Sequence, residues 1–567
     1  MKILKNNPFV LCSFDGFGFR TADRLARKLG TDPTLPDRLA ESIQYLFDEY
    51  ASNGHTCVPS DVFLERLYNE LNRDYSGAPV PRQLIQEALK TAFARQEIRA
   101  SKNPGQDTVY LYSSPRYDQE QELAKGLGRL LSGKAEPVGD IEPFIREYEQ
   151  EVGMTLADSQ RAAVQNAFRH QVNIITGGAG TGKTTTLRAI LFVHQKVFGD
   201  KSQPILMAPT GRAASRMTEA TGVPAATVHS LIAFRGESER EDNQRLDPDG
   251  KLDGNLFIVD ECSMMDLFIS QALVRKIPSE ARLIFVGDPG QLPSVGCGNV
   301  LYDMIASGAV PTSKLTVIFR QANENPIVYN STQIRQGKMD LLEAPQFAVR
   351  EGRDTESIFR QACSLYCKAV DRTKLDDVML LCPYRSKSDL NVDRFNRKLQ
   401  ELINPARTGD LSMKKGSMHF LPRDRVMQMK NTEEAHNGDI GVILRIDEIY
   451  DPDTESHKKI AAIEFNGDGV EHYYDENMIY ELDLAYCTTI HKAQGSEAPI
   501  VIMVLSEQHS IALRRPLIYT GVTRSKTNFI LVTDWGRKAW NDAIANDSTD
   551  ARWTMLSQRL RAVQRKA

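Results

Sequence analysis

The sequence lacks the long apolar runs that membrane spans and secretion signals require. No stretch of its 567 residues approaches the roughly eighteen uncharged apolar residues of a membrane span, and the N-terminus has no signal-peptide hydrophobic region. The eight cysteines form no repeated C-x-x-C pattern, and the spacing of Cys363 and Cys367 on a helical stretch is typical of core packing. These absences predict a protein of the reducing cytoplasm without a membrane partner.

An excess of positive charge is also missing. The 70 Lys and Arg residues against 74 Asp and Glu residues give a net charge of −4, so no global field attracts nucleic acid. Any nucleic-acid contact must therefore come from a local groove. The length predicts several domains, and the 41% apolar and 25% charged fractions are ordinary for globular proteins.

Residues 177–184 complete the pattern G-x-x-x-x-G-K-[ST] between a β-branched run at 172–176 and a helical pattern at 184–198. A glycine-rich turn between a strand and a helix points backbone N–H groups toward phosphates, which an ordinary glycine-rich turn does not do. The lysine of the pattern reaches the β- and γ-phosphates, and the hydroxyl that follows it ligates Mg²⁺. The predicted nucleotide-binding residues of this loop are Gly177, Gly178, Ala179, Gly180, Thr181, Gly182, Lys183, Thr184 and Thr185.

Strands and helices alternate after about residue 150, which predicts an α/β fold with parallel sheets covered on both faces. The spread of the runs favours two sheets, one on each side of about residue 320. The predicted strands are 204–208, 256–259, 283–286, 378–382, 499–504 and 529–532. Between the runs at 378–382 and 499–504, residues 422–480 contain shorter strands and an Asn437-Gly438 turn. These features predict a small antiparallel barrel inserted in the second unit.

The first 150 residues are rich in helical patterns and show no comparable series of strands. Gly16 and Gly18 lie in a turn that either offers amides to a DNA phosphate, as in helix-hairpin-helix modules, or packs helices for protein contacts. Both interpretations stay open. Residues 60–71 begin a segment that we interpret as a winged-helix-like unit.

Polar residues at three further places suit phosphoryl transfer. Asp260 ends a predicted strand where it can hold Mg²⁺, and the adjacent Glu261 can orient and deprotonate water. Gln291 follows another strand and is placed to sense the γ-phosphate. Arg320 and Arg524 are candidate arginine fingers, although either one alone would be typical of a surface salt bridge.

These motifs, taken in order, resemble those of superfamily 1 helicases, and their wording is most similar to the RecD-like branch, which moves 5′→3′ on DNA. The Gln160 segment resembles the motif whose glutamine reads adenine, and residues 16–23 resemble the front of stand-alone RecD-like helicases. The likeness covers about residues 150–535 and extends over nearly the whole chain with the N-terminal block. Its remaining motifs are 208–214, 227–230, 260–263, 287–293, 319–321, 489–495 and 519–524.

The resemblance implies a division of the chain. It implies a helical N-terminal domain at 1–150, a first RecA-like motor domain at 151–320 and a second at 321–567. A β-hairpin pin that separates strands is expected at about 233–254, and an SH3-like barrel at about 405–482. A pin is sufficient as a wedge, because stacking contributes only about 1.4 kcal/mol per base-pair step, but a solvent hairpin without a role remains the alternative.

The resemblance also implies which residues contact single-stranded DNA without reading its sequence. These are Pro209, Thr210, Arg212, His229, Thr489, His491 and Lys492. The two histidines can alternatively be loop residues with local partners. Some RecD-like proteins have a longer N-terminal region, so partner docking by such a region is in doubt here, and no carboxylate cluster of a nuclease follows residue 535.

We therefore predict a monomeric, ATP- and Mg²⁺-dependent motor that translocates 5′→3′ on single-stranded DNA and unwinds duplexes from junctions. DNA repair, recombination and replication are the expected settings, and single-stranded-DNA-binding or recombination proteins are the expected partners. Two alternatives remain at this stage. One is a DNA-stimulated ATPase that remodels protein–DNA complexes with little unwinding. The other is a DNA-binding switch subunit of a larger complex.

Overall fold

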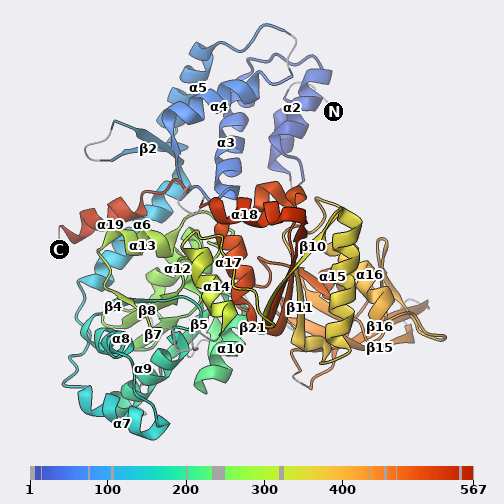
Figure 1. Cartoon of the computed structure of the whole chain (residues 1–567). Helices are drawn as coiled ribbons and strands as arrows, with labels where there is room; N and C mark the ends of the chain where they lie inside the picture. Colours follow the sequence, from blue (N-terminus) through green and yellow to red (C-terminus); the bar gives the residue numbers. More distant parts are fainter. Residues whose placement is uncertain are drawn as a thin grey trace.

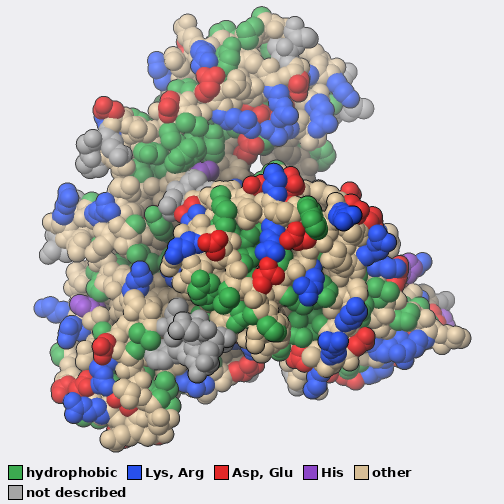
Figure 2. All heavy atoms as spheres, in the orientation of Figure 1, with side chains coloured by type: hydrophobic (Ala, Val, Ile, Leu, Met, Phe, Trp, Pro, Cys, Tyr) green, Lys and Arg blue, Asp and Glu red, His purple; other side chains and the backbone are tan. Residues whose placement is uncertain are grey.

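The computed structural model describes residues 7–14, 16–74, 77–103, 107–199, 202–232, 250–317, 325–432, 435–451, 456–467, 469–547 and 552–565. Two sheet-containing units lie side by side, and a helical unit made from the beginning of the chain stands against one end of the pair (Figure 1). Lys and Arg side chains interleave with Asp and Glu over the visible face, so no large field of one sign covers it (Figure 2). None of the described helices has the length and apolar character that crossing a membrane requires.

The first unit contains a six-stranded sheet in the order β6-β5-β7-β8-β4-β9, in which every pair is parallel. Its central strands are buried along their whole length, as continuous apolar runs between two helical layers must be. The strands are β4 (Val172–Thr176), β5 (Ile205–Ala208), β6 (Ala225–Thr227), β7 (Leu256–Val259), β8 (Arg282–Gly287) and β9 (Thr312–Lys314). The helices are α8 (Asp158–Arg169), α9 (Lys183–Phe198), α10 (Gly211–Thr221), α11 (Val228–Ile232), α12 (Leu267–Lys276) and α13 (Val300–Ser307).

The second unit contains a five-stranded parallel sheet in the order β10-β21-β20-β11-β19. The predicted pair of parallel α/β sheets is thus confirmed. The strands are β10 (Phe347–Gly352), β11 (Val378–Cys382), β19 (Cys487–Thr489), β20 (Ala498–Val504) and β21 (Ser525–Asp534). The helices are α14 (Pro326–Arg335), α15 (Thr355–Val370), α16 (Val392–Ile403), α17 (Arg515–Thr523) and α18 (Lys538–Ala545).

An antiparallel insert joins α16 to β19, as predicted. Its main sheet has the order β17-β16-β15-β14-β18, and a hairpin of β12 and β13 lies before it in the chain. Gly438, with φ of +101°, makes the turn between β14 and β15. The strands are β12 (Met413–Lys415), β13 (Met418–Phe420), β14 (Arg425–Gln428), β15 (Ile440–Asp451), β16 (Ser456–Phe465), β17 (His472–Tyr474) and β18 (Leu482–Leu484).

The N-terminal unit is helical, but it also contains a small sheet that the sequence did not indicate. Its three strands pair antiparallel in the order β1-β3-β2. From α3 onward the elements follow the order helix, strand, helix, helix and hairpin, which is the order of a winged-helix unit. The elements are η1 (Pro8–Ser13), α2 (Phe19–Lys28), α3 (Pro36–Ser52), β1 (Val58–Pro59), α4 (Ser60–Leu71), α5 (Arg82–Ala94), β2 (Ile98–Lys102) and β3 (Val109–Ser113).

Packing divides the chain differently from the predicted boundaries at residues 150 and 567. Helices α6 (Ser114–Leu131) and α7 (Glu142–Val152) bury their apolar faces in the cores of the first sheet, not in the N-terminal unit. The C-terminal helix α19 (Leu556–Gln564) also returns to the first unit, where Leu556 and Leu560 join the same core as Leu127. The predicted bounds 1–150 and 321–567 are therefore wrong at these helices, because each apolar face is covered by a part of the chain remote in sequence.

Candidate nucleotide-binding site and DNA-facing surface

The glycine-rich loop lies between β4 and α9, at the carboxyl edge of the first sheet. Gly180 and Gly182 have φ of +75° and +80°, a conformation that favours glycine. The Lys183 ammonium folds back over the loop and donates to the carbonyls of Gly177 at 2.8 Å and Gly178 at 3.1 Å. The cation is thereby held where the pattern predicts nucleotide phosphates.

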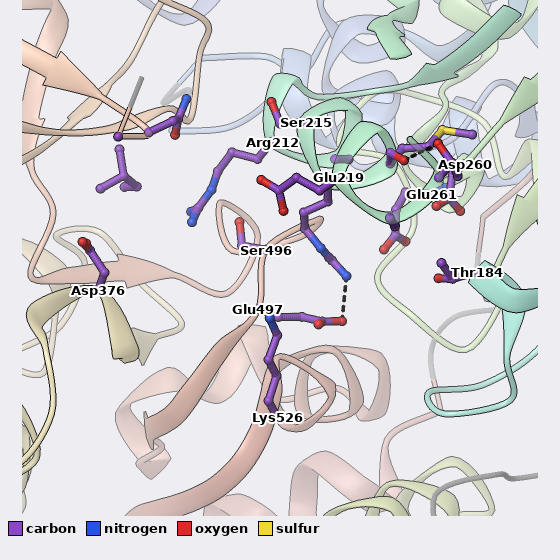
Figure 3. Close-up of a pocket in the computed structure, with 18 of the residues that line it drawn as sticks. Thr184, Arg212, Ser215, Glu219, Asp260, Glu261, Asp376, Ser496, Glu497 and Lys526 are labelled. Carbon is purple, nitrogen blue, oxygen red and sulfur yellow. Dashed lines mark hydrogen bonds and ion pairs between the residues drawn. The ribbon is translucent and has the colours of Figure 1, made fainter. Parts of the chain in front are cut away.

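Asp260 and Glu261 follow β7 beside this loop. Asp260 Oδ1 accepts from the Glu261 N–H at 2.8 Å, and burial together with the Glu261 carboxylate raises the pKa of Asp260. Glu261 has φ of +49°, a left-handed conformation that costs free energy for a non-glycine residue and is concentrated at active sites. Asp260, Glu261 and the exposed Thr184 line a cleft of about 890 Å³ between the two sheet-containing units (Figure 3).

These residues fit a magnesium ion. Among the described residues no group of three or more His, Cys, Asp or Glu side chains forms a complete metal site. Magnesium bound together with a nucleotide does not need one, because it usually takes one or two carboxylates, substrate phosphates and water. The Asp260 carboxylate and the Thr184 hydroxyl on one wall of the cleft are suitable ligands of this kind.

Two buried polar side chains beside the contact between the two units lack ordinary partners among the described residues. Gln291 is 6% exposed, and its Oε1 has no hydrogen-bond donor. Arg524 is 2% exposed and donates only to Thr520 O, Ser496 O and Thr523 Oγ1, at 3.0, 3.2 and 3.2 Å. No carboxylate of the described chain pairs with this guanidinium. Because buried charges and buried polar atoms are normally paired, the Arg524 guanidinium is suited to an anionic ligand and the Gln291 amide oxygen to a ligand or water that donates.

The two units contact each other directly beside these groups. The Leu292 N–H donates to Thr520 Oγ1 at 2.9 Å, and Gln494 Nε2 donates to Leu292 O at 3.0 Å. Arg216 on α10 lies 2.8 Å from the Glu497 carboxylate, an ion pair drawn in Figure 3. The turn that carries Gln291 is therefore bound to the second unit through both the N–H and the carbonyl of the next residue, Leu292.

The remaining residues predicted to contact nucleotide do not line the cleft or lie outside the described residues. Gln160 is 1% exposed, and its amide is engaged with the Ala157 N–H and Gly182 O. Its proposed role in reading adenine stays a prediction. Thr185 lies in the first turn of α9. Arg320 and residues 233–249 of the predicted pin lie outside the described residues.

Most of the predicted DNA-contacting residues follow strands at the facing edges of the two sheets. Pro209 and Thr210 follow β5, and Thr210 Oγ1 would lie 3.2 Å from a methyl group placed on Gly495. Thr489, His491 and Lys492 end or follow β19. The structure brings these two segments together.

The histidines and the arginine of the predicted DNA-contacting set differ in exposure and in the surface that they face. His229, on α11, and His491 are exposed. Arg212 is the one member of the predicted set that lines the nucleotide-side cleft, and its side chain extends from α10 into the space between the lining elements (Figure 3). Burial, and then the charge of Arg425, lowers the pKa of Arg212 to about 10.

Sequence reasoning missed three contacts at this junction. The barrel turn reaches both sheets, since Lys492 Nζ donates to Asn437 Oδ1 and a methyl group on Gly211 would lie 3.1 Å from His436 Cβ. Tyr519 of the second unit reaches the phosphate loop, where its hydroxyl accepts from Ala179 N at 3.3 Å. The Asn-Gly turn and the motif around Tyr519 were recognised, but neither indicates a partner on its own.

Family models and a solved structure match this chain along much of its length. Family models match at residues 1–57 (ATP-dependent RecD2 DNA helicase HHH domain), 160–297 (AAA domain), 395–465 (ATP-dependent RecD-like DNA helicase SH3 domain) and 484–532 (UvrD-like helicase C-terminal domain). A solved Bacteroides Pif1 helicase in complex with ADP-AlF3 and ssDNA is 18% identical, with a TM-score of 0.42 over 70% of this chain and 96% of that one.

Two relatives are similar over most of their length. The RecBCD enzyme subunit RecD of Mycolicibacterium smegmatis is 30% identical over 460 residues, which are 74% of this chain and 78% of that protein. The ATP-dependent RecD2 DNA helicase of Deinococcus radiodurans is 30% identical over 575 residues, which cover 99% of this chain and 74% of the relative. The chain therefore belongs to the family of RecD-like ATP-dependent DNA helicases.

Proposed function

We propose that this chain is an ATP-driven motor that translocates 5′→3′ along single-stranded DNA and unwinds the duplex ahead of it. The observation that carries the proposal is that the phosphate loop of one unit meets the second unit, where Tyr519 Oη accepts from Ala179 N at 3.3 Å. The helix of Tyr519 leads directly to Arg524, a buried arginine that has no carboxylate partner among the described residues. A site of this kind is completed only when nucleotide draws the two units together, which is what a motor requires. The proposed 5′→3′ direction of translocation rests on the similarity of the motif sequences to those of the RecD-like branch.

In this proposal each group at the cleft has a distinct task. Lys183 leaves the loop carbonyls to bind the β- and γ-phosphates, and Glu261 orients and deprotonates the attacking water. Thr184 and Asp260 would hold a magnesium ion, which would supply positive charge against the phosphates. Arg524 and Arg320 stabilise the charge that develops on the transferring phosphoryl group.

Gln291 links hydrolysis to the DNA track. It lies on the turn that follows β8, and the next residue, Leu292, is hydrogen-bonded to Thr520 and Gln494 of the second unit. Loss of the γ-phosphate removes the ligand of Gln291, and the rigid connection through Leu292 transmits that loss to residues 489–495. Residues 489–495, which include Lys492, and Thr210 hold the single-stranded DNA by phosphate contacts that are independent of its sequence.

Two further features support the setting of this activity. All eight cysteines are free thiols, as expected for the reducing cytoplasm that we propose as its location. The N-terminal unit stands against one end of the two motor units (Figure 1), and the barrel turn with His436 and Asn437 reaches their junction, where a single-strand/double-strand junction would arrive. We infer that the pin at about 233–254 acts as the wedge there.

Unwinding of two matched duplexes tests the proposal. One duplex carries a 5′ single-stranded tail and the other a 3′ tail, and ATP hydrolysis is followed in the same reactions. We expect unwinding from the 5′ tail alone, with hydrolysis stimulated by single-stranded DNA. Unwinding from the 3′ tail alone would overturn the polarity. Hydrolysis without strand separation on either substrate would favour a translocase that remodels protein–DNA complexes.

The pin is tested separately by deletion of residues 233–254. Strand separation should be lost while DNA-stimulated hydrolysis persists, because the deleted residues include none of the nucleotide-site residues. Unchanged strand separation in the deletion variant would refute the wedge assignment.

A further inference from the structure

Arg335 ends helix α14 of the second unit, yet its guanidinium lies over the phosphate loop of the first. A methyl group in place of the Gly178 hydrogen would lie 3.2 Å from Arg335 Nη1, and one on Gly290 would lie 3.2 Å from Nε. The guanidinium is thus packed between two glycine backbones. Lys183 donates to the carbonyl of the same Gly178 at 3.1 Å. Two cations from two units therefore converge on one residue of the loop.

Asp288, at the end of β8, is the acidic partner of Arg335. Its carboxylate is fully buried and accepts from Tyr519 Oη at 2.6 Å and from Gly290 N at 3.0 Å, whereas Arg335 Nη2 lies farther away, at 3.6 Å. Asp288 therefore keeps two close donors if Arg335 moves away. The Arg335 side chain is 34% exposed and makes no hydrogen bond to the described residues. Its five N–H donors remain available to a ligand.

We propose that Arg335 contacts the γ-phosphate of bound ATP, as a third arginine beside Arg320 and Arg524. This inference rests on the ATP hydrolysis proposed above for the same site. In a phosphate loop the lysine reaches the β- and γ-phosphates, and Arg335 and Lys183 share Gly178 as a neighbour. Asp288 holds the guanidinium in place until the γ-phosphate replaces the long ion pair by shorter, charge-assisted hydrogen bonds.

The contact also connects the third phosphate to the second unit. Arg335 is the last residue of α14, and α14 packs against α17, the helix that carries Tyr519 and precedes Arg524 (Figure 1). A displacement of Arg335 would therefore move α14 against α17, the helix that precedes Arg524. ADP lacks the γ-phosphate and leaves Arg335 with Asp288.

Nucleotide affinity tests the proposal. Isothermal titration of the full chain with Mg²⁺ and either ATP or ADP uses Glu261→Gln in every variant, so that ATP is bound but not consumed. Arg335→Ala should weaken ATP binding by about tenfold to a hundredfold, the usual effect of losing hydrogen bonds to a charged group, and leave ADP binding within about twofold. Arg335→Lys should lie between the two, because it keeps the charge without the planar fork. Arg360→Ala, an exposed arginine on α15, is the matched control.

Equal weakening of ATP and ADP binding, or no weakening of either, would overturn the proposal, because Arg335 would then serve only to pack the two units. If the alanine variant does not fold, the ATP-to-ADP ratio of Arg335→Lys decides in the same way. A chain that binds both nucleotides but does not hydrolyse ATP with single-stranded DNA refutes the proposed function, while the Arg335 comparison still stands. A chain that binds neither nucleotide refutes both.

Discussion

Arg552 donates a hydrogen bond from Nη1 to the backbone carbonyl of Gly298 across 2.6 Å, which ties the end of the chain to the loop that follows Gln291. The same guanidinium donates to Ser294 O at 2.6 Å and to Gly296 O at 3.2 Å. The next residue, Trp553, stacks on His55 with ring centroids 4.5 Å apart. The C-terminal segment thus connects the N-terminal unit to the loop that follows Gln291.

Removing this guanidinium is expected to impair coupling more than binding. Arg552→Ala removes a guanidinium donor from three carbonyls of residues 294–298, of which the last two keep only a shared donor in Ser294 Oγ, and so loosens the loop only three residues after Gln291. We expect the rate of ATP hydrolysis at saturating single-stranded DNA to fall about three- to tenfold, in line with about 1 kcal/mol per lost hydrogen bond. Arg565→Ala, at an exposed arginine of the same segment, should match the unmodified chain. Equal rates in both variants would contradict a role for Arg552.

Gly54→Ala tests the same connection from the other side. A methyl group there would lie 2.3 Å from Arg552 Nε, and Gly54 has φ of +90°, which other residues rarely adopt. The Gly54 carbonyl also accepts from Gly298 N at 2.9 Å. We expect this variant to lower the DNA-stimulated rate as Arg552→Ala does, and the double variant to add little because both changes act on one contact. Additive effects would show that the two residues act separately.

Glu120 of α6 is expected to be a main source of stability for the joined units. Its carboxylate is fully buried and accepts from Thr56 Oγ1 at 2.9 Å, Tyr112 Oη at 2.8 Å, Met555 N at 3.1 Å and Arg559 Nε at 3.0 Å. Glu120→Ala removes a fully buried acid and leaves Arg559, whose side chain is only 15% exposed, without its partner, a loss of up to about 3–5 kcal/mol. The thermal unfolding midpoint should fall by several degrees. Asp118→Ala, an exposed carboxylate on the same helix, is the control, and an equal midpoint in both variants would contradict the prediction.

Asp303 on α13 is expected to make stability depend on pH. Burial raises its pKa to about 8, against the opposing hydrogen bond from Thr554, and Glu120 adds to the rise. An unfolded Asp loses its proton near pH 3.9, so the folded chain binds more protons between about pH 4 and 8. The stability contributed by this group therefore falls as pH rises through that window, by up to about 1.4 kcal/mol per unit.

Asp303→Asn removes the titration and keeps a neutral polar side chain beside Thr554. The thermal midpoint of this variant should drop less between pH 6 and pH 8 than that of the unmodified chain, and it should be the higher of the two at pH 8. Asp118→Asn should leave the slope unchanged. A slope that is the same in all three proteins would show that Asp303 is already charged in the folded state.

The buried strands were the easiest part of the fold to predict. Strands β7 and β11 coincide with their predicted apolar runs, because a strand covered on both faces must be apolar along its length. The edge strands β9 and β19 were missed, since each has three residues and carries polar side chains such as Thr312 and Thr489. Their place is set by pairing with a neighbour, which no local pattern records.

The residues of the nucleotide site likewise fall into those that a local pattern identifies and those that only the three-dimensional fold reveals. The phosphate loop is a local pattern, so Lys183 and Thr184 could be identified from a few residues. The Ala179–Tyr519 contact joins residues 340 positions apart. Arg335 is similar, because nothing in the residues around it distinguishes it from a surface arginine. Such groups become visible only when the two sheets are placed against each other.

Lys183→Ala provides the most direct check on the nucleotide site. The ammonium is the one side-chain cation of the loop, and its loss removes the group that stabilises the phosphates in the transition state. ATP hydrolysis at saturating single-stranded DNA should fall by at least about a hundredfold. The fold should persist, because the lost bonds are to two loop carbonyls that water can satisfy. Lys196→Ala lies on the same helix and removes a surface ion pair with Glu147 and a cation–π contact with Phe192, neither of them in the loop, so it should hydrolyse ATP normally. Hydrolysis retained in Lys183→Ala would mean that the nucleotide is bound elsewhere, and that the Arg524 and Gln291 geometry serves another purpose.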